Sequence, residues 1–205
     1  MKNPTFTMRP DTCDPLVVQE VWYSDCYGFK GRDWKGKSVF DIGANIGAFT
    51  VLAALEGAIV SSYEPEPNNY AILQRNCLDN AVSPTLSAKG VGYEGYGWFD
   101  DNNGGTRKGI HGAKVEIVSV NGLWDSPVDF LKVDVEGSEY EIVLDATEKT
   151  LSLVREFAAE FHPDLTDQET HEEAMAKLSR FFDLRITGGI PQRAGGIVFG
   201  KRKAS

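Results

Sequence analysis

The feature that most constrains this chain is a glycine turn between an apolar run and a helical pattern. It reads Asp-Ile-Gly-Ala-Asn-Ile-Gly over residues 41–47, after the apolar run 38–40 and ahead of the helical pattern 46–56. A buried strand that turns tightly into a helix lets a ligand approach the backbone, because glycine has no Cβ. The turn also directs N–H groups and the positive end of a helix toward that ligand. It therefore predicts a nucleotide-type cofactor site.

Composition restricts the partners that this chain can bind. Its 205 residues suit one domain with a full core, and 41% of them are hydrophobic. The formal net charge of −9 argues against nucleic acid, which calls for a basic face. No apolar run approaches the roughly 20 residues that span a bilayer. We therefore expect a soluble, cytoplasmic protein that binds neither nucleic acid nor membrane.

The cysteines give no sign of a covalent framework. Cys13, Cys26 and Cys77 are odd in number, and none is spaced as C-x-x-C. This pattern favours neither disulfides nor a zinc site. Free thiols in a reducing compartment are the expectation.

Strand and helix patterns alternate from Ser38 onward. We expect strands at 38–42, 58–63, 85–89, 128–133 and 156–161, helices at 46–56, 67–79, 139–147 and 167–182, and a closing antiparallel pair at 184–187 and 196–200. This alternation predicts an α/β fold with a doubly wound, mostly parallel sheet and an antiparallel C-terminal strand. Ligands bind such sheets at the carboxyl ends of the strands. Asp41, Glu64, Asp134 and His162 are therefore expected along one edge.

Two of the expected helices begin with the pattern of a capping box. In one, Ser138 precedes Glu141, and in the other Thr166 precedes Glu169. In a capping box the hydroxyl side chain accepts a hydrogen bond from the first turn of the helix. We expect both helices to begin in this way.

The chain is expected to divide into three parts. Residues 1–37 form an N-terminal helical lid, and residues 38–205 form the core domain. Within the core, residues 92–118 form a β-hairpin insertion with its tip at 100–109. This insertion is rich in aromatic residues, Tyr93, Tyr96, Trp98 and Phe99. They either hold a substrate or pack on the sheet, and the sequence leaves both readings open.

The glycine turn discriminates between cofactors. A dinucleotide fold calls for G-x-G-x-x-G, but Asn45 occupies the second glycine position and Ala48 the third. A pyrophosphate is therefore disfavoured. The pattern D-x-G-x-N-x-G is similar to the first motif of class I S-adenosylmethionine-dependent methyltransferases. Asp41 would then hold the cationic amino group of the cofactor, directly or through water.

An acid follows the second expected strand. Glu64 lies in Tyr-Glu-Pro, and Pro65 turns the chain toward the next helix. An acid at this place accepts hydrogen bonds from both ribose hydroxyls. The cofactor-binding residues expected from these two stretches and the next are Asp41, Gly43, Ala44, Asn45, Gly47, Glu64, Pro65 and Asp134.

A second signature is Phe-Leu-Lys-Val-Asp-Val-Glu-Gly-Ser-Glu over residues 130–139. Asp134 and Glu136 stand just beyond a buried strand, where carboxylates need water, a cation or each other. The sulfonium of the cofactor is such a cation. The alternative is an ion pair between Lys132 and Glu139 with solvated neighbours.

The third signature is Glu-Phe-His over residues 160–162. On an extended segment Glu160 and His162 point to the same side. His162 could take a proton from an acceptor hydroxyl near neutral pH. We expect it to be the base, with Asp134 or Glu136 as second choice. A divalent ion held by Asp134, Glu136 and Glu160 is a further expectation, because oxygen ligands suit Mg²⁺.

With these stretches in order, the chain resembles the FkbM-type family of S-adenosylmethionine-dependent methyltransferases. The matching stretches are 39–50, 63–76, 131–139, 142–146 and 160–162. The resemblance implies the seven-stranded, Rossmann-like sheet of class I methyltransferases. It also implies cofactor roles for the turn and Glu64, and active-site roles for Asp134, Glu136 and His162.

The resemblance implies O-methylation of a hydroxyl on a small molecule or sugar, with the oligomeric state left open. One alternative is a nicotinamide-dependent oxidoreductase, against which Asn45 speaks. Another is a non-catalytic domain that binds S-adenosylmethionine, which the joint presence of Asp134, Glu136 and His162 disfavours.

Overall fold

A central seven-stranded sheet organises the computed structural model, which describes residues 4–102, 105–109, 111–187 and 196–204. The strand order is β10-β11-β9-β8-β1-β2-β3, and β11 runs antiparallel to both of its neighbours while the other pairs are parallel. The strands are β1 (Ser38–Ile42), β2 (Ile59–Tyr63), β3 (Thr85–Ser87), β8 (Val128–Val133), β9 (Val154–Phe161), β10 (Phe182–Thr187) and β11 (Gly196–Arg202). The predicted doubly wound sheet is confirmed.

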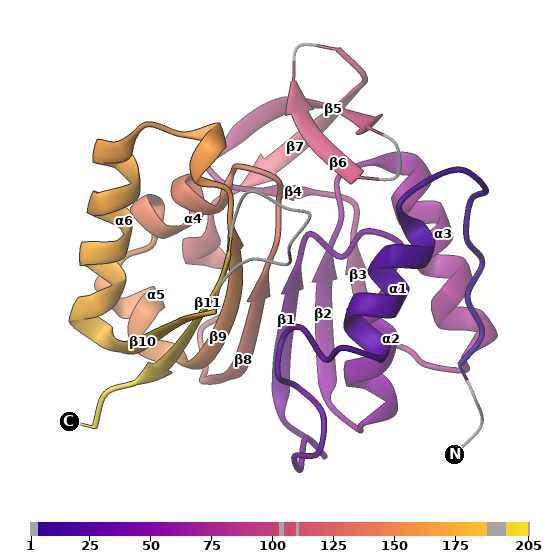
Figure 1. Cartoon of the computed structure of the whole chain (residues 1–205), viewed down its shortest axis with the longest axis horizontal. Coiled ribbons are helices and arrows are strands. Elements are labelled where there is room, and N and C mark those ends of the chain that lie inside the picture. Colours follow the sequence, from indigo (N-terminus) through magenta and orange to yellow (C-terminus); the bar gives the residue numbers. More distant parts are fainter. Residues whose placement is uncertain (1–3, 103–104, 110, 188–195, 205) are drawn as a thin grey trace.

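Helices cover both faces of this sheet (Figure 1). One group is α1 (Asp14–Trp22), α2 (Ala48–Leu55) and α3 (Pro67–Asp79), and the other is α4 (Glu139–Asp145), α5 (Glu148–Leu153) and α6 (Gln168–Phe181). Successive strand residues face opposite sides. Val39 and Phe130 therefore pack in the core beside α1 and α2, while Phe40 and Leu131 pack in the core beside α4 and α6. The short helix α5 was not predicted.

The helix starts differ from the predicted capping boxes. Ser138 precedes α4, but its side chain makes no capping hydrogen bond. Helix α6 is capped by Asp167, whose Oδ1 accepts from the backbone N–H of Thr170 at 2.8 Å. The capping-box predictions at Ser138 and Thr166 are therefore wrong. At α6 the neighbouring aspartate offers an equally good acceptor one residue later.

The N-terminal segment is part of the core as well as a cover. Phe29 and Trp34 are buried, and their rings stack with centroids 4.2 Å apart. Phe29 also meets Phe49 of α2 and Phe130 of β8 edge to face. These aromatic contacts tie the segment that follows α1 to the central sheet.

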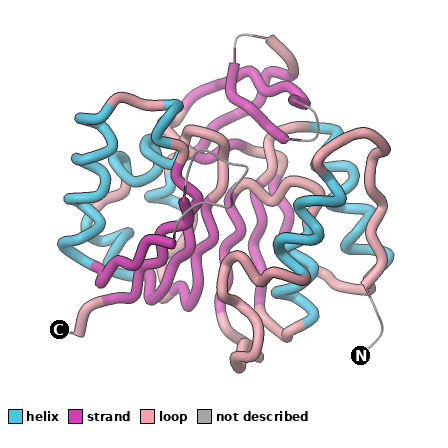
Figure 2. The backbone as a smooth tube through the Cα atoms, in the orientation of Figure 1, coloured by secondary structure: helices cyan, strands magenta, loops and turns pink. Residues whose placement is uncertain are grey.

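The insertion forms a second sheet above the carboxyl edge of the first (Figures 1 and 2). Its order is β4-β7-β5-β6, with β4 (Gly90–Val91), β5 (Gly95–Asn102), β6 (Gly105–Gly109) and β7 (Ala113–Val118). Within the expected insertion, β5 pairs antiparallel with β7. The segment 100–109 was expected as the tip of a hairpin, but it carries the end of β5 and an additional strand, β6. Short single-turn 3-10 helices follow β7 at Val120–Gly122 and β9 at Pro163–Leu165.

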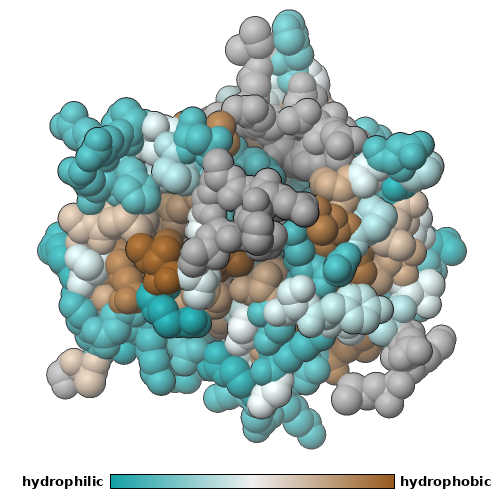
Figure 3. Space-filling view, viewed as in Figure 1, coloured by the Kyte–Doolittle hydropathy of each residue, from teal (hydrophilic) through white to brown (hydrophobic). Residues whose placement is uncertain are grey.

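Surface properties of the described residues agree with the composition. None of the helices that the structure describes is long and apolar enough to cross a membrane. In the view of Figure 3, hydrophilic side chains surround the rim of the molecule, with apolar patches nearer its middle. Cys13, Cys26 and Cys77 are free thiols, as predicted.

Candidate active site

The glycine turn between β1 and α2 has the backbone of a tight, left-handed bend. Gly43 and Gly47 have φ angles of 81° and 88°, and Asn45 has a φ of 51°. Asparagine is one of the few residues that adopts this region readily. A Cβ at Gly43 would lie 1.8 Å from the carbonyl oxygen of Asp134, so this glycine lets the loop after β8 approach the turn. At Gly47 a Cβ would meet Leu73 at 2.5 Å.

The N–H groups of the turn are engaged within the protein. The donors pair as follows: Gly43 and Ala44 to the carbonyl of Tyr63, Asn45 to Glu64 Oε2, Ile46 to Asn45 Oδ1, and Gly47 to the carbonyl of Ala44, at 2.6–3.0 Å. The expectation of N–H groups directed at a ligand is therefore wrong for residues 43–47. A pyrophosphate would find no donors in this stretch, since anion sites at such turns depend on them.

Asp41 lies beneath the turn. It is fully buried, its Oδ2 accepts a 2.6 Å hydrogen bond from Thr50, and its Oδ1 lies 3.2 Å from the ammonium of Lys132. Lys132 also donates to the carbonyl of Gly43 at 2.5 Å. Lys132 and Thr50 contact the two carboxylate oxygens, and a contact of Asp41 with the cofactor, directly or through water, stays a prediction. Asp41 fixes the shape of the turn.

Lys132 is charged in this environment. Burial lowers its pKa, but the carboxylates of Asp41 and Asp134 raise it, and the net pKa is above the ordinary lysine value. The alternative pairing of Lys132 with Glu139 does not occur, since Lys132 pairs with Asp41 and Glu139 bonds His162.

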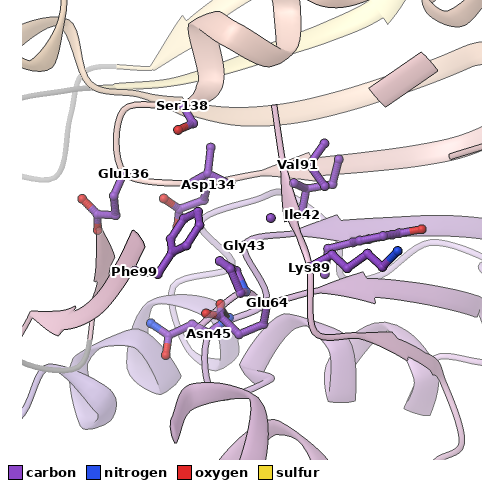
Figure 4. A pocket seen from close by; sticks show the side chains of 14 residues that line it. Ile42, Gly43, Asn45, Glu64, Lys89, Val91, Phe99, Asp134, Glu136 and Ser138 are labelled. Atoms are coloured by element: carbon purple, nitrogen blue, oxygen red, sulfur yellow. Dashed lines mark hydrogen bonds between the residues drawn. The ribbon is translucent and has the colours of Figure 1, made fainter. Parts of the chain in front are cut away.

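A hollow opens beside the turn, between the ends of β1 and β2 and the loop after β8. Figure 4 shows Glu64 and Asn45 in one part of its wall and Asp134 and Glu136 in another, with the ring of Phe99 nearby. The predicted residues Gly43, Asn45, Glu64, Pro65 and Asp134 all line it. The carboxylate of Glu64 also accepts from the N–H groups of Asn45 and Glu66, at 2.8 and 2.9 Å.

A second hollow lies on the other side of the turn. It shares Gly43, Asn45, Asp134 and Glu136 with the first, so the two form one crevice. Its remaining lining residues are Cys13, Val17, Glu20, Val21, Tyr27, Ala44, Ala48, Phe49 and Lys132. The N-terminal segment therefore closes this half of the crevice. Of the predicted turn residues, Gly47 lines neither hollow and serves packing against Leu73.

Asp134 stands where the two hollows meet. Its Oδ2 accepts a 2.9 Å hydrogen bond from the hydroxyl of Tyr27. Burial and the charge of Asp134 raise the pKa of Tyr27 well above 10, so the phenol stays a donor. Oδ1 of Asp134 is buried and has no hydrogen-bond partner among the described residues. An unpaired buried carboxylate oxygen of this kind can accept a hydrogen bond from water or a ligand, or contact a cation.

His162 lies next to this carboxylate and is buried. Its Nδ1 is 2.9 Å from Oε1 of Glu139, and its Nε2 faces Glu136 Oε2 at 3.5 Å and Glu160 Oε1 at 3.9 Å. Glu139 is fully buried and also accepts from the N–H groups of residues 135 and 137. This anchoring fixes the ring, with Nδ1 toward Glu139 and Nε2 toward Glu136 and Glu160.

The carboxylates determine the charge of His162. Burial lowers its pKa, but the hydrogen bond and charge of Glu139, together with the charges of Asp134 and Glu136, raise it to about 9. The ring is then charged at neutral pH in the ligand-free protein. This charge disfavours the expected role of His162 as the base.

The residues that the structure brings together as candidate metal ligands differ from the expected set. Asp134, Glu136 and His162 each place one candidate ligand atom within 4.8 Å of the others. The sequence led us to expect Glu160 in place of the imidazole. Glu160 lies beside the ring, 3.9 Å from Nε2.

Comparison with known families identifies the group to which this site belongs. The sequence model of the family described as "Methyltransferase FkbM domain" matches residues 41–183, from the turn to beyond His162. This chain belongs to the FkbM methyltransferase family. The family that the sequence resemblance indicated is therefore confirmed.

One curated relative is the 31-O-demethyl-FK506 methyltransferase FkbM of Streptomyces tacrolimicus, which is 37% identical over 71 residues. The match spans 33% of this chain and 27% of that protein. Methyltransferase FkbM from Methylobacillus flagellatus KT superposes with a TM-score of 0.60 at 17% identity, over 89% of this chain and 47% of that chain. The tRNA (uracil-54, C5)-methyltransferase of Pyrococcus abyssi, in complex with S-adenosyl-L-homocysteine, superposes with a TM-score of 0.51 at 13% identity. The superposition covers 98% of this chain and 40% of that chain. The structural likenesses show a shared fold.

Two residues of the FkbM site were missed from the sequence. No role for Tyr27 was inferred from the sequence, and Glu139 was considered only in an alternative ion pair with Lys132. Tyr27 is 107 positions from Asp134, and Glu139 is 23 positions from His162. For Glu139, the sequence signal was an acid directly after the Glu-Gly-Ser loop, in the first turn of a helix that buries one face. An acid at such a buried place needs a partner.

Proposed function

We propose that this FkbM-family methyltransferase transfers a methyl group to a hydroxyl oxygen of a small molecule or sugar. The observation that carries the proposal is that Asp134 and Glu136 line both hollows, with His162 close behind them. The curated FkbM relative is named as a methyltransferase of an O-demethyl compound, which supports oxygen as the acceptor atom. Localisation in the cytoplasm stays a prediction.

The residues of the crevice fit S-adenosylmethionine. Glu64 faces the first hollow, and a carboxylate accepts about four hydrogen bonds, so it can hold the turn and still accept from ribose hydroxyls. We assign the adenosine to this hollow, beside Phe99, and the methionine portion to the second hollow. Asp134 lines both and would lie nearest the sulfonium. Its buried Oδ1 supplies the negative charge that a cationic centre requires.

The cluster would also receive the proton of the acceptor. When bound, the cofactor supplies a methyl group whose bond to sulfur breaks as a bond to the acceptor oxygen forms. Glu136, with a side chain 37% exposed, is the group we assign to take the hydroxyl proton. Such a base contributes about 10²–10⁴-fold to the rate. Holding the reactants at near-attack distance supplies the larger share.

Two other readings are disfavoured by particular contacts. A nicotinamide cofactor needs donors for its pyrophosphate, and the N–H groups of residues 43–47 are already engaged. A domain that only binds S-adenosylmethionine has no use for a buried carboxylate oxygen beside an anchored imidazole. The net charge of −9 counts against a nucleic-acid acceptor.

The test uses cofactor with a ¹³C-labelled methyl group and a panel of hydroxyl-bearing small molecules and sugars. The expected product is an O-methyl ether, identified by mass spectrometry and NMR. Asp134→Asn should abolish the product, whereas Glu173→Gln, on the exposed face of α6, should leave it unchanged. Label found on nitrogen, carbon or RNA would contradict the proposal, as would equal turnover by Asp134→Asn.

A further inference from the structure

Two potential metal ligands, Asp134 and His162, each have one polar atom held by a hydrogen bond and a second polar atom that such a bond leaves available. The phenol of Tyr27 holds Oδ2 of Asp134, which leaves Oδ1 buried without a hydrogen-bond partner among the described residues. Glu139 holds Nδ1 of His162, which leaves Nε2 facing carboxylates at 3.5 and 3.9 Å. Tyr27 and Glu139 come from different parts of the chain, so both potential ligands are oriented independently.

This arrangement has the features of a metal site. Metal-binding histidines usually donate their second ring nitrogen to a carboxylate, which fixes the tautomer and makes the other nitrogen a better ligand. The contact between Glu139 and His162 supplies that support, and binding of the ion would displace the Nε2 proton to solvent. Asp134, Glu136 and His162 then present two carboxylates and one imidazole, with ligand atoms within 4.8 Å of one another. We propose that these three residues bind a divalent cation.

The charges around the cluster favour a cation as well. Carboxylates of Asp134, Glu136, Glu139 and Glu160 surround one imidazole. The ammonium of Lys132 pairs with Asp41 and the carbonyl of Gly43, beneath the turn. A sulfonium accounts for negative charge near Asp134, but it does not account for an anchored imidazole nitrogen. A divalent ion uses both.

The ligand set indicates which ion to expect. Oxygen ligands suit Mg²⁺, Mn²⁺ and Ca²⁺, while imidazole favours the first-row transition metals. Two carboxylates with one imidazole therefore suit Mn²⁺, with Mg²⁺ as a weaker competitor. Three protein ligands leave coordination positions for acceptor oxygens. Figure 4 shows Asp134 and Glu136 on the wall of the first hollow, and both also line the second, so an acceptor bound to the ion would lie where the two hollows meet.

The consequence for catalysis rests on the proposed function, whereas binding of the ion does not. A hydroxyl that coordinates the ion would lose its proton to solvent more readily, because a divalent cation stabilises the alkoxide. The oxygen would then form its bond to the methyl carbon as the bond between carbon and sulfur breaks. The ion would take over the role that Glu136 has in the ion-free protein.

Manganese binding tests the site directly. The full chain, treated with a chelator and then freed of it, is titrated with Mn²⁺ while the EPR signal of the aqueous ion is followed. One ion should bind per chain with a dissociation constant below about 1 mM. Glu136→Gln should weaken binding at least about tenfold, and Glu173→Gln should leave it unchanged. Absence of saturable binding, or equal binding by Glu136→Gln, would overturn the proposal.

A second measurement keeps the proposal testable if Glu136→Gln fails to fold. In the wild-type chain, which has three histidines, bound Mn²⁺ should broaden the ring protons of His162 at low ion ratios and spare those of His111. Equal broadening of both would overturn the site. Bound Mn²⁺ without methyl transfer would refute the proposed function alone. Methyl transfer that is undiminished after chelation would refute the catalytic role of the ion.

Discussion

Replacing Gly43 with alanine introduces both a backbone clash and a left-handed φ angle for a residue with a Cβ. Comparison with a second glycine that has only the left-handed φ angle should show how much stability the clash costs. Gly43 has a φ of 81°, and its missing Cβ would lie 1.8 Å from the carbonyl oxygen of Asp134 and 2.7 Å from its carbonyl carbon. Ordinary contact begins at 3.4 Å, so the backbone of Asp134 would have to withdraw by about 1.6 Å. That movement would shift the carboxylates at the centre of the crevice.

Gly36 provides the matched control. It has a φ of 70°, is exposed, and has nothing within 4 Å of the point where a Cβ would lie. Gly36→Ala should lose about 1–2 kcal/mol, the cost of a left-handed backbone for a residue with a Cβ. In a protein of this size that loss lowers Tm by about 2–8 °C. Gly43→Ala adds the backbone clash and should lose at least about 3–4 kcal/mol.

Both variants would be compared by urea denaturation and by calorimetric titration with S-adenosylhomocysteine. Gly43→Ala should be clearly less stable than Gly36→Ala and should bind at least about tenfold more weakly, since it displaces the loop that carries Asp134. Gly36→Ala should bind as the wild type does. The reasoning would be refuted if the two alanine variants lost equal stability and bound the ligand equally well.

Three further substitutions test buried contacts. Lys132→Met should lose about 3–5 kcal/mol because Asp41 becomes an unpaired buried charge, and adding Asp41→Asn should recover part of that loss in urea denaturation; a double variant no more stable than the single would contradict the pairing. Glu139→Ala should lose about 3–5 kcal/mol, since it leaves two backbone N–H groups and a charged imidazole without their acceptor. A loss below about 1 kcal/mol would show that these bonds matter little. Glu64→Gln should weaken S-adenosylhomocysteine binding about 10–100-fold by calorimetry, or about 1.4–2.8 kcal/mol, with Glu173→Gln as the unaffected control; unchanged affinity would remove the ribose assignment.

The strands of the central sheet were predictable from local patterns. The apolar runs 38–42 and 128–133 end at polar turns, and β1 and β8 have those bounds. The place of Glu64 and Asp134 at one edge followed from parallel strands alone. The same reasoning missed α5, because six residues are too few for helical periodicity to be recognised.

Side-chain pairing across the fold was not predictable in the same way. The carboxylates around the site compete for Lys132 and His162. Which carboxylate pairs with which cation depends on distances that sequence spacing does not contain. Lys132 pairs with Asp41 on the neighbouring strand, because β1 and β8 are adjacent and place these two residues in register. Glu139 is then available for His162, whose pKa rises as a result. The expected base thus became a charged residue.

The identity of the cofactor is the central claim, and equilibrium binding tests it most directly. The full chain would be titrated by calorimetry with S-adenosylhomocysteine and, in a separate experiment, with NAD⁺. We predict saturable binding of one S-adenosylhomocysteine per chain and no heat of binding from NAD⁺, because the turn has no N–H groups left over residues 43–47 for a pyrophosphate. Binding of NAD⁺ without binding of S-adenosylhomocysteine would contradict the account.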